Sequence, residues 1–399
     1  MTRYLITVGV ILLLFIGTFG AFNYFVDPLL LYQQQGSSNA TLNRVDQFDN
    51  MRFSKPYHVL ELKPDAIIIG SSRSGTIIPK HAQWLGLKGY NFSLPGMTLN
   101  EINRSVRHAH ANHRLNKLMI GIDYQAVVSP LPTSRSGFEP DRLVSSATGF
   151  RSATYLGQYL TDLQASLLSL DIASESLAAL SPPGPRVRKY FSNGIWRSIT
   201  NQLTGRGGYI FSAKNTARTR EVTPFEADTN LAIYEDLLRF CYSNNIDTRL
   251  FLTPTHVFVV DLWFGLASEA LWRDTHRRLL AINQQLASEY NRTAFIIRGF
   301  GNEAQVTDEP IYLARHIERA WFDDGVHYRA KMANGLMKGV WDTHSDFGQN
   351  LSSDNIDQYL DSIDALLISD CAAVANCEAS SAIALDATSA PIESVRPFT

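Results

Sequence analysis

The sequence is poor in cysteine and lacks the common cofactor and metal motifs. Its three cysteines, Cys241, Cys371 and Cys377, are too few for a disulfide-stapled scaffold, and none belongs to a Cys-x-x-Cys pair. Cys371 and Cys377 could pair outside the cytoplasm, or could be two incidental thiols. The Gly-x-x-x-x-Gly-Lys, Gly-x-Gly-x-x-Gly and His-Glu-x-x-His patterns are all absent. We therefore expect neither a metal nor a cofactor.

The sequence also lacks an excess of either charge. It has 36 Lys and Arg against 38 Asp and Glu, a formal net charge of −2. Because phosphate backbones are bound by basic surfaces, we expect no nucleic acid among the partners. A hydrophobic content of 45% and a charged content of 19% are typical of a globular chain. The 399 residues suffice for one large domain or two small ones.

Charged residues are missing from residues 4–26, which are almost wholly apolar and lie between Arg3 and Asp27. About 20 apolar residues are enough to cross a bilayer. The early positive charge favours a cytoplasmic N-terminus, with the bulk of the chain outside. We predict an uncleaved anchor over residues 1–28, because the apolar run continues through aromatic residues that suit a membrane interface. A cleaved signal peptide and a buried core helix are the alternatives.

Short apolar stretches alternate with helical patterns along the middle of the chain. Strands are expected at residues 66–70, 89–93, 117–122, 247–253 and 293–297. A helix is expected at about residues 99–113, and apolar spacing at i, i+3 and i+4 predicts helices at residues 232–240 and 271–286. This alternation predicts an α/β fold with a parallel sheet covered by helices.

The remaining segments suggest a division into four parts. A juxtamembrane linker is expected at residues 29–58, the α/β domain at 59–345, and a C-terminal helix with a mobile tail at 346–399. The strand–helix alternation is interrupted at about residues 129–226, which we interpret as a partly helical insertion in the domain. Insertions beyond strand ends often form lids or substrate platforms.

Polar residues that could carry chemistry follow the ends of the expected strands. The first strand stops at Gly70 and is followed by Ser71, Ser72 and Arg73. Ligands of open parallel sheets bind beyond the carboxyl ends of the strands. Ser72 could therefore be a nucleophile, or it could merely cap a following helix. Arg73 could bind a substrate carboxylate or phosphate, or form a surface salt bridge.

A late Asp-x-x-His motif supplies what a serine nucleophile needs. Asp324 and His327 are spaced i, i+3, although a lone pair of this kind is more often a surface turn. A serine hydroxyl requires a base, and a histidine oriented by a carboxylate is the usual one. Gly96, Asp123 and His256 also follow expected strands. We interpret His256 as a substrate contact or a structural histidine at a strand end.

Three of these segments resemble the conserved blocks of the SGNH (GDSL-type) hydrolase superfamily. Gly70-Ser71-Ser72 resembles its Gly-Asp-Ser block, residues 91–96 its second block, and Asp324 to His327 its final block. With the anchor, the chain is most similar to envelope proteins related to the D-alanine transfer protein of teichoic acid modification. It is more loosely similar to exopolysaccharide acetylation proteins. The resemblance spans roughly residues 60–345 and implies a three-layer α/β/α, flavodoxin-like fold with acyl-ester chemistry.

The resemblance also implies roles for individual residues. Ser72 would be the nucleophile, His327 the base and Asp324 its orienting partner, with the Ser72 and Gly96 amides binding the oxyanion. The third block of the family usually supplies an asparagine where this chain has Asp123. A carboxylate cannot donate a hydrogen bond, so another group would have to substitute or hydrolysis would be weak. The candidate substitutes are Asn100, Asn103, Gln125 and Arg73.

These inferences predict a function at the cell envelope. We expect a single-pass inner-membrane protein with a periplasmic domain that transfers acyl groups through Ser72 to an envelope glycan. The resemblance implies that a multi-pass membrane acyltransferase could supply the acyl donor. A catalytically inactive scaffold or binding module is the alternative from another class, and an esterase that removes acyl groups is a third.

Overall fold

A six-stranded sheet forms the centre of the protein. The computed structural model describes residues 1–29, 31–32, 50–128, 134–144, 153–180, 188–190, 193–198, 224–257, 259–260, 269–303, 321–323, 326–342 and 344–372. The spatial order of the strands is β2 (Gly89–Asn91), β1 (Ala66–Ile69), β3 (Lys117–Ile122), β6 (Asp247–Leu252), β7 (Ile296–Gly299) and β8 (Gln349–Leu351). Every pairing is parallel except that of β7 with β8. The predicted α/β fold is confirmed, and the sheet is parallel as predicted except at β8.

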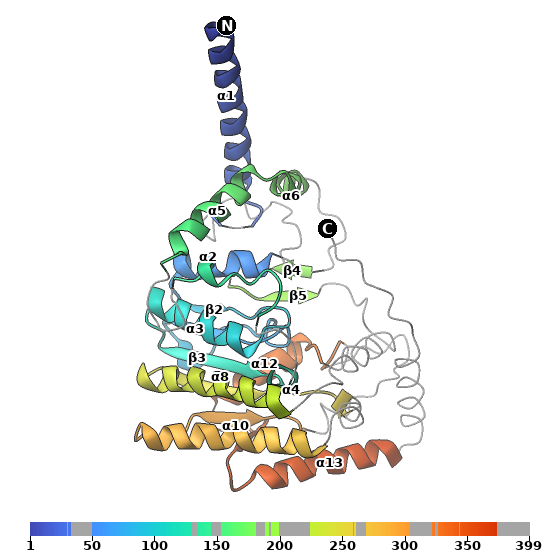
Figure 1. Cartoon of the computed structure of the whole chain (residues 1–399). Coiled ribbons are helices and arrows are strands. Elements are labelled where there is room, and N and C mark those ends of the chain that lie inside the picture. The colour runs from blue at the N-terminus through green and yellow to red at the C-terminus, as the bar shows by residue number, and fades with distance from the viewer. Residues whose placement is uncertain are drawn as a thin grey trace.

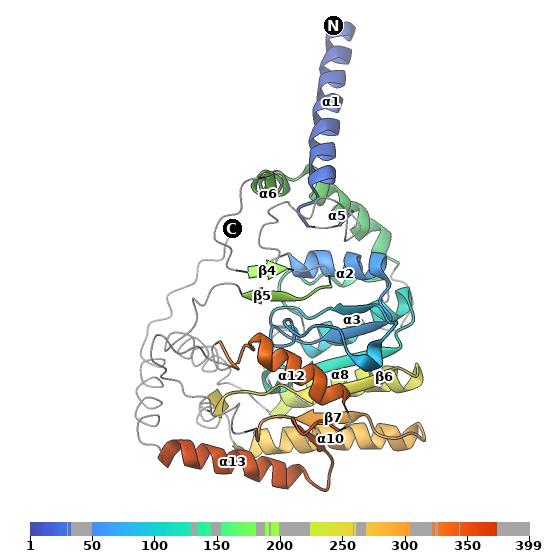
Figure 2. The ribbon, with the colours of Figure 1, turned by 180° about the vertical axis from the view of Figure 1, so that it is seen from behind.

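Successive side chains of the strands belong to two different hydrophobic clusters, and helices contribute to both. In β1, Ile67 and Ile69 belong to one hydrophobic cluster, whereas Ala66 and Ile68 belong to another. The helices that line the first cluster include α3 (Leu99–Asn112), α8 (Pro224–Ser243) and α10 (Glu269–Glu289). They lie toward the viewer in Figure 1, and α12 (Ala330–Trp341), which lines the second cluster, lies toward the viewer in Figure 2. The sheet is therefore apolar on both faces, because successive residues of a strand point to opposite sides.

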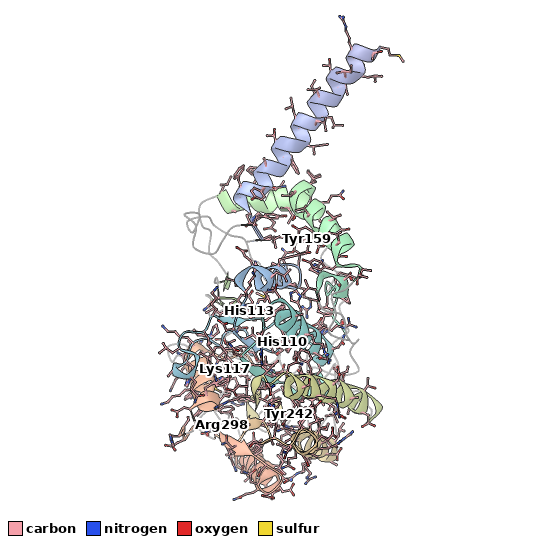
Figure 3. All side chains as sticks on the ribbon, turned by 90° about the vertical axis from the view of Figure 1, so that its left-hand side faces the viewer. His110, His113, Lys117, Tyr159, Tyr242 and Arg298 are labelled. Atoms are coloured by element: carbon pink, nitrogen blue, oxygen red, sulfur yellow. The ribbon has the colours of Figure 1, made fainter. Side chains whose placement is uncertain are left out.

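The N-terminal helix α1 (Thr2–Val26) projects away from this domain. It is long and apolar enough to cross a membrane, a property that a signal sequence near an N-terminus shares. Its side chains stand clear of the rest of the protein along most of its length (Figure 3). The predicted insertion contains α5 (Tyr155–Leu168), α6 (Leu170–Leu180) and an antiparallel hairpin of β4 (Arg188–Tyr190) and β5 (Trp196–Ser198). The α5–α6 pair lies at the foot of α1 (Figure 1).

Part of the predicted linker is instead structured. Residues 51–58 belong to α2 (Met51–Leu62), which contains Pro56 and buries Lys55 and His58 beside apolar residues. This mixture of polar and apolar residues on one buried face hides the helical period, so the sequence did not indicate this helix. Residues 33–49 of the linker lie outside the described part of the chain.

Towards the C-terminus the fold differs from expectation in two strands. Strand β7 begins three residues later than predicted, and β8 was not expected because two of its three residues, Gln349 and Asn350, are polar. The predicted C-terminal helix is α13 (Ile356–Ala372), and the expected mobile tail from residue 373 onward lies outside the described residues. The short α4 (Tyr124–Val128) follows β3 directly.

Two buried histidines make the stability of the domain sensitive to acid. His108 Nδ1 accepts a hydrogen bond from the Val144 amide at 3.0 Å, and its Nε2 lies 3.0 Å from the Pro56 carbonyl oxygen, so the ring is neutral with its proton on Nε2. Burial lowers the pKa of His108 to about 4. Burial likewise lowers the pKa of His276, next to the Trp272 carbonyl, to about 4.

We expect the free energy of unfolding to fall as the pH drops from about 6.5 to 4. In this window the histidines of the unfolded chain bind protons that the folded chain does not, which removes roughly 2–3 kcal/mol for each histidine. Thermal unfolding of the full chain in detergent across this range measures the effect. His108→Gln should be less stable at pH 7 but lose less stability on acidification. An unchanged pH slope would contradict the assignment.

Candidate active site

Ser72 lies in a tight turn at the carboxyl end of β1. The Ser74 amide donates to the Ser71 carbonyl at 3.0 Å, and the Ile77 amide to the Ser74 carbonyl at 3.1 Å. The Ser74 side chain is fully buried beneath the turn, where a Cβ on Gly70 or on Gly121 of β3 would collide with its hydroxyl. The absence of a side chain at both positions therefore lets the turn pack closely against the sheet. Residues 71–76 form bends and turns instead of a helix, so the interpretation of Ser72 as a helix cap is wrong.

His327 is held by a short loop with buried anchors on both sides. Phe322 and Tyr328, both buried, form an antiparallel bridge. The Asp323 amide donates to the His327 carbonyl at 2.9 Å, which closes the loop between the anchors. The Tyr328 hydroxyl donates to the Pro254 carbonyl at 3.1 Å, just beyond β6. Tyr328, and with it the neighbouring His327, is thereby held at the carboxyl edge of the sheet.

The fold brings Ser72 and His327 together. Ser72 Oγ lies 2.9 Å from His327 Nε2, although the two residues are 255 positions apart in the sequence, and both are half-buried. This distance lies within the range that proton transfer from a serine to a histidine base requires. Asp324, the predicted third member, lies outside the described residues, as does Gly325.

Arg73 is buried, and it connects three strand ends around this pair. Its guanidinium donates to the Thr253 hydroxyl at 3.2 Å and to the Thr255 hydroxyl at 2.9 Å, both beyond β6. Its Nε lies 3.9 Å from Asp123 Oδ2 at the end of β3. The interpretation as a surface salt bridge is therefore wrong. The contact of the two threonines with Arg73 was not predicted from the sequence, because it depends on how the strands align.

Asp123 is a buried carboxylate with a loose ion pair. The residue is 7% exposed, and its Oδ1 has no hydrogen-bond partner within the described ranges of the chain. Burying such a charge is unfavourable unless hydrogen bonds and an opposite charge compensate, and here the compensation is incomplete. Tyr328, which the sequence analysis did not single out, has a pKa that the charges of Arg73 and Asp123 both affect. Burial raises the pKa of the Tyr328 phenol well above its ordinary value, opposed by Arg73 and reinforced by Asp123, so the phenol stays neutral.

Gly96 lies in the loop that follows β2. Its φ of 56° is a left-handed conformation that favours glycine. The Leu94 amide donates to the Gly70 carbonyl at 3.1 Å, which brings this loop beside the turn of Ser72. Among the described residues, neither the Ser72 amide nor the Gly96 amide has a hydrogen-bond acceptor. Both amides are thus available as donors, which the predicted oxyanion site requires.

A buried lysine fixes the same loop from behind. Lys55 Nζ on α2 donates to the carbonyls of Asn91, Ser93 and Gly194 at 2.7–2.9 Å. Burial lowers the Lys55 pKa well below its ordinary value. These bonds join α2, the end of β2 and the turn of the β4–β5 hairpin. The hairpin also packs on the Ser72 turn, where the Trp196 amide donates to the Gly75 carbonyl at 3.1 Å.

The remaining predicted site residues lie elsewhere or have other contacts. His256 is 1% exposed, and its ring meets the Phe322 ring edge-on at 6.0 Å, so it supports the loop of His327. The Asn100 and Asn103 side-chain amides donate to Ser134 and Asp236 at 3.0 and 2.8 Å. Both asparagines line a hollow of about 490 Å³ between α3 and α8 that contains neither Ser72 nor His327. Gln125 lies on α4, directly after Asp123 and Tyr124.

Comparison with known proteins adds no further constraint on this site. No family model matches the chain, and no curated protein matches it in sequence. Within the described residues, no group of three or more His, Cys, Asp or Glu side chains could hold a metal ion. Cys377 and the side chain of Cys371 lie outside the described part of the chain, whereas Cys241 is a buried free thiol.

Proposed function

We propose that this protein is a membrane-anchored serine acyltransferase that transfers an acyl group to a hydroxyl of a cell-envelope glycan. The observation that carries the proposal is the 2.9 Å contact between Ser72 Oγ and His327 Nε2 at the carboxyl edge of the sheet. The buried supports on either side of the pair favour a preorganised site over a chance contact.

The proposed fold is the three-layer, flavodoxin-like arrangement of the SGNH superfamily. Its support is the strand order. Numbered along the chain, the five parallel strands lie in the order 2-1-3-4-5, which is the flavodoxin-like order. Ser72 follows β1 and Asp123 follows β3, the two strands between which that order reverses. Ligands of such sheets bind beside this reversal.

The proposed reaction has two acyl transfers. Ser72 Oγ attacks the acyl carbonyl of an ester or thioester donor while its proton passes to His327 Nε2. The bond to the donor then breaks, and the departing oxygen or sulfur takes that proton. A glycan hydroxyl next attacks the acyl-serine and gives its proton to His327, and Ser72 Oγ recovers this proton as it leaves. The amides of Ser72 and Gly96 would hold the oxyanion in both steps, and Asp324 would orient the imidazole.

The proposed location is the cell inner membrane, with the domain on its periplasmic side. The support is α1, which carries a single positive charge, Arg3, at its N-terminal end. An uncleaved anchor is favoured because buried Asn23, near the end of α1, bonds both helices of the insertion. A multi-pass membrane acyltransferase is the proposed source of the acyl donor.

Two other functions share these features. A catalytically inactive scaffold of an envelope assembly complex is favoured by Asp123, whose charge would repel an oxyanion. An esterase would use the same residues with water as the acceptor. An esterase would hydrolyse simple esters rapidly as the full chain alone, the proposed acyltransferase would hydrolyse them only slowly, and a scaffold would form no acyl-serine at all.

A covalent probe of serine nucleophiles tests the proposal. The full chain in detergent should be labelled by a fluorophosphonate, and Ser72→Ala should abolish labelling because the attacking oxygen is gone. Ser288→Ala, at an exposed serine on α10, should be labelled like the wild type. In cells, Ser72→Ala should also abolish acylation of the envelope polymer. Full acylation in cells that produce only Ser72→Ala would refute the proposal.

A further inference from the structure

The helices α5 and α6 expose leucines next to the membrane helix. Leu170 is 78% exposed, Leu180 54% and Leu160 55%, which is unusual for large apolar side chains of one short segment. Residues 155–180 contain no Lys or Arg. Asp162, the only charge on α5, is buried in an ion pair with Arg142 at 2.5 Å and accepts a hydrogen bond from Tyr57. The outer face of α5 is therefore uncharged, whereas α6 carries two acids, the exposed Asp171 and the half-buried Glu175, which an interfacial helix can turn toward the lipid headgroups.

The helix pair is joined rigidly to the foot of α1. Asn23 is fully buried, donates to the Leu167 carbonyl at 2.8 Å and accepts from the Ser176 hydroxyl at 2.9 Å. Further up α1, Leu168 packs over Gly20, where an added Cβ would lie 3.5 Å from Leu168 Cδ2. Helix α5 therefore contacts α1 through its C-terminal end, and α6 contacts α1 through its buried face.

The position of Gly20 sets the depth of the contact. A helix advances about 1.5 Å per residue, and the hydrocarbon layer is about 30 Å thick, so a span of about 20 residues that begins after Arg3 ends near Asn23. Gly20 then lies inside the hydrocarbon boundary, and Leu168, which touches it, lies at the same depth. The junction between α5 and α6 cannot remain in water if α1 spans the membrane.

We propose that the α5–α6 junction and α6 are embedded in the bilayer leaflet on the side of the domain. Helix α6 lies across the foot of α1, because Figure 1 views α6 nearly end-on while α1 runs along the page. This is the orientation of a helix in the membrane interface. Helix α5 descends from α1 toward α2, and Tyr159 lies near the α2 side (Figure 3), where its ring meets Tyr57 at 6.0 Å. The leucines near the junction thus contact acyl chains, whereas the start of α5 returns to water.

Contact of α6 with lipid would orient the domain relative to the membrane more firmly than α1 alone. A lone membrane helix leaves the attached domain free to tilt. Two attachment elements, joined through buried Asn23, fix the domain relative to the membrane plane. The Ser72–His327 pair is then held at a constant height above the lipid, whatever reaction it performs.

A depth measurement with a fluorophore tests the proposal. Single cysteines for labelling are Leu170→Cys, Leu156→Cys and Gln358→Cys, in a background with Cys241→Ala, Cys371→Ser and Cys377→Ser. Leu156 is a matched control, because it is 65% exposed but lies at the far end of α5 from Gly20. Gln358 is an exposed reference on α13, at the end of the molecule opposite α1 (Figure 1). The full chain is reconstituted as single copies in nanodiscs of phospholipids that carry a quencher on their acyl chains.

The expected result is strong lipid quenching and a blue-shifted emission for Leu170→Cys. Leu156→Cys should be quenched much less, and Gln358→Cys should be quenched only by aqueous iodide. Equal iodide access at positions 170 and 358 would overturn the proposal. The proposal would also be overturned if the fluorophore at position 170 were protected from iodide but not quenched by the lipid. Protein would then cover the leucines. The outcome does not depend on catalysis at Ser72.

Discussion

His327→Gln should slow fluorophosphonate labelling of Ser72 by about 10²–10⁴-fold, the range that a positioned general base contributes. The 2.9 Å contact lets Nε2 take the serine proton as the new bond forms. Glutamine occupies a similar space and can donate a hydrogen bond to Ser72 Oγ, but it cannot accept the proton at neutral pH. The measurement is the time course of labelling at a fixed probe concentration.

A double substitution separates cooperation from two independent contributions. Residues that act as a unit show strongly non-additive effects. Ser72→Ala with His327→Gln should therefore be no slower in residual ester turnover than Ser72→Ala alone. His344→Gln, at an exposed histidine beyond α12, is the control and should label at the wild-type rate. Labelling of His327→Gln within a factor of about two of the wild type would leave the pair without a catalytic role.

The part of the fold that sequence could predict is the part with strong local signals. Strand β3 matches its expected bounds, and β1 and β6 differ from theirs by one residue. Strand β1 is apolar throughout and stops at Gly70, whereas β3 after Lys117 and the second half of β6 are apolar stretches that stop at Asp123 and Thr253. The pairing of Ser72 with His327 was predictable for a related reason. Both belong to recognisable motifs: Ser72 follows β1 at the carboxyl edge of the sheet, and His327 lies just before α12.

The supports of the site could not be predicted, because they depend on contacts between distant segments. Lysines are mostly exposed, and nothing in the sequence marks Lys55 as buried. Yet three carbonyls from two other elements surround it. Thr255 and Thr253 carry no pattern of their own, and their contacts with Arg73 appear only once β6 lies beside β3. A polar residue in a buried position is specified by its partners, and those partners are invisible in a local window of sequence.

The second large effect is expected at Asp123, the residue that departs from the pattern of the resembled family. Asp123→Asn should raise the turnover of simple esters by the full chain about 10–10³-fold, because one oxyanion donor is typically worth about 10²–10³ in rate. The substitution removes a negative charge from the end of β3, where it opposes a developing oxyanion. It also adds an N–H donor without changing the shape of the side chain.

The surroundings of Asp123 indicate that the fold should tolerate this change. Its ion pair with Arg73 is loose at 3.9 Å, and Arg73 keeps its bonds to Thr253 and Thr255. Oδ1 has no hydrogen-bond partner in the described ranges, so few contacts are lost. Thermal unfolding should occur at a somewhat lower temperature, because buried Arg73 is left without this opposite charge, but the 3.9 Å separation should make the loss smaller than for a close buried pair.

Asp236→Asn is the matched control, because it makes the same chemical change in the hollow between α3 and α8. Ester turnover should not respond to it, although the loss of the Arg107 ion pair should lower stability slightly. A gain at Asp123→Asn would mean that the native carboxylate restrains hydrolysis, which suits an enzyme that must pass its acyl group to a glycan hydroxyl and not to water. A loss of turnover would instead show that the carboxylate assists the reaction, and the comparison with an oxyanion asparagine would fail at this residue.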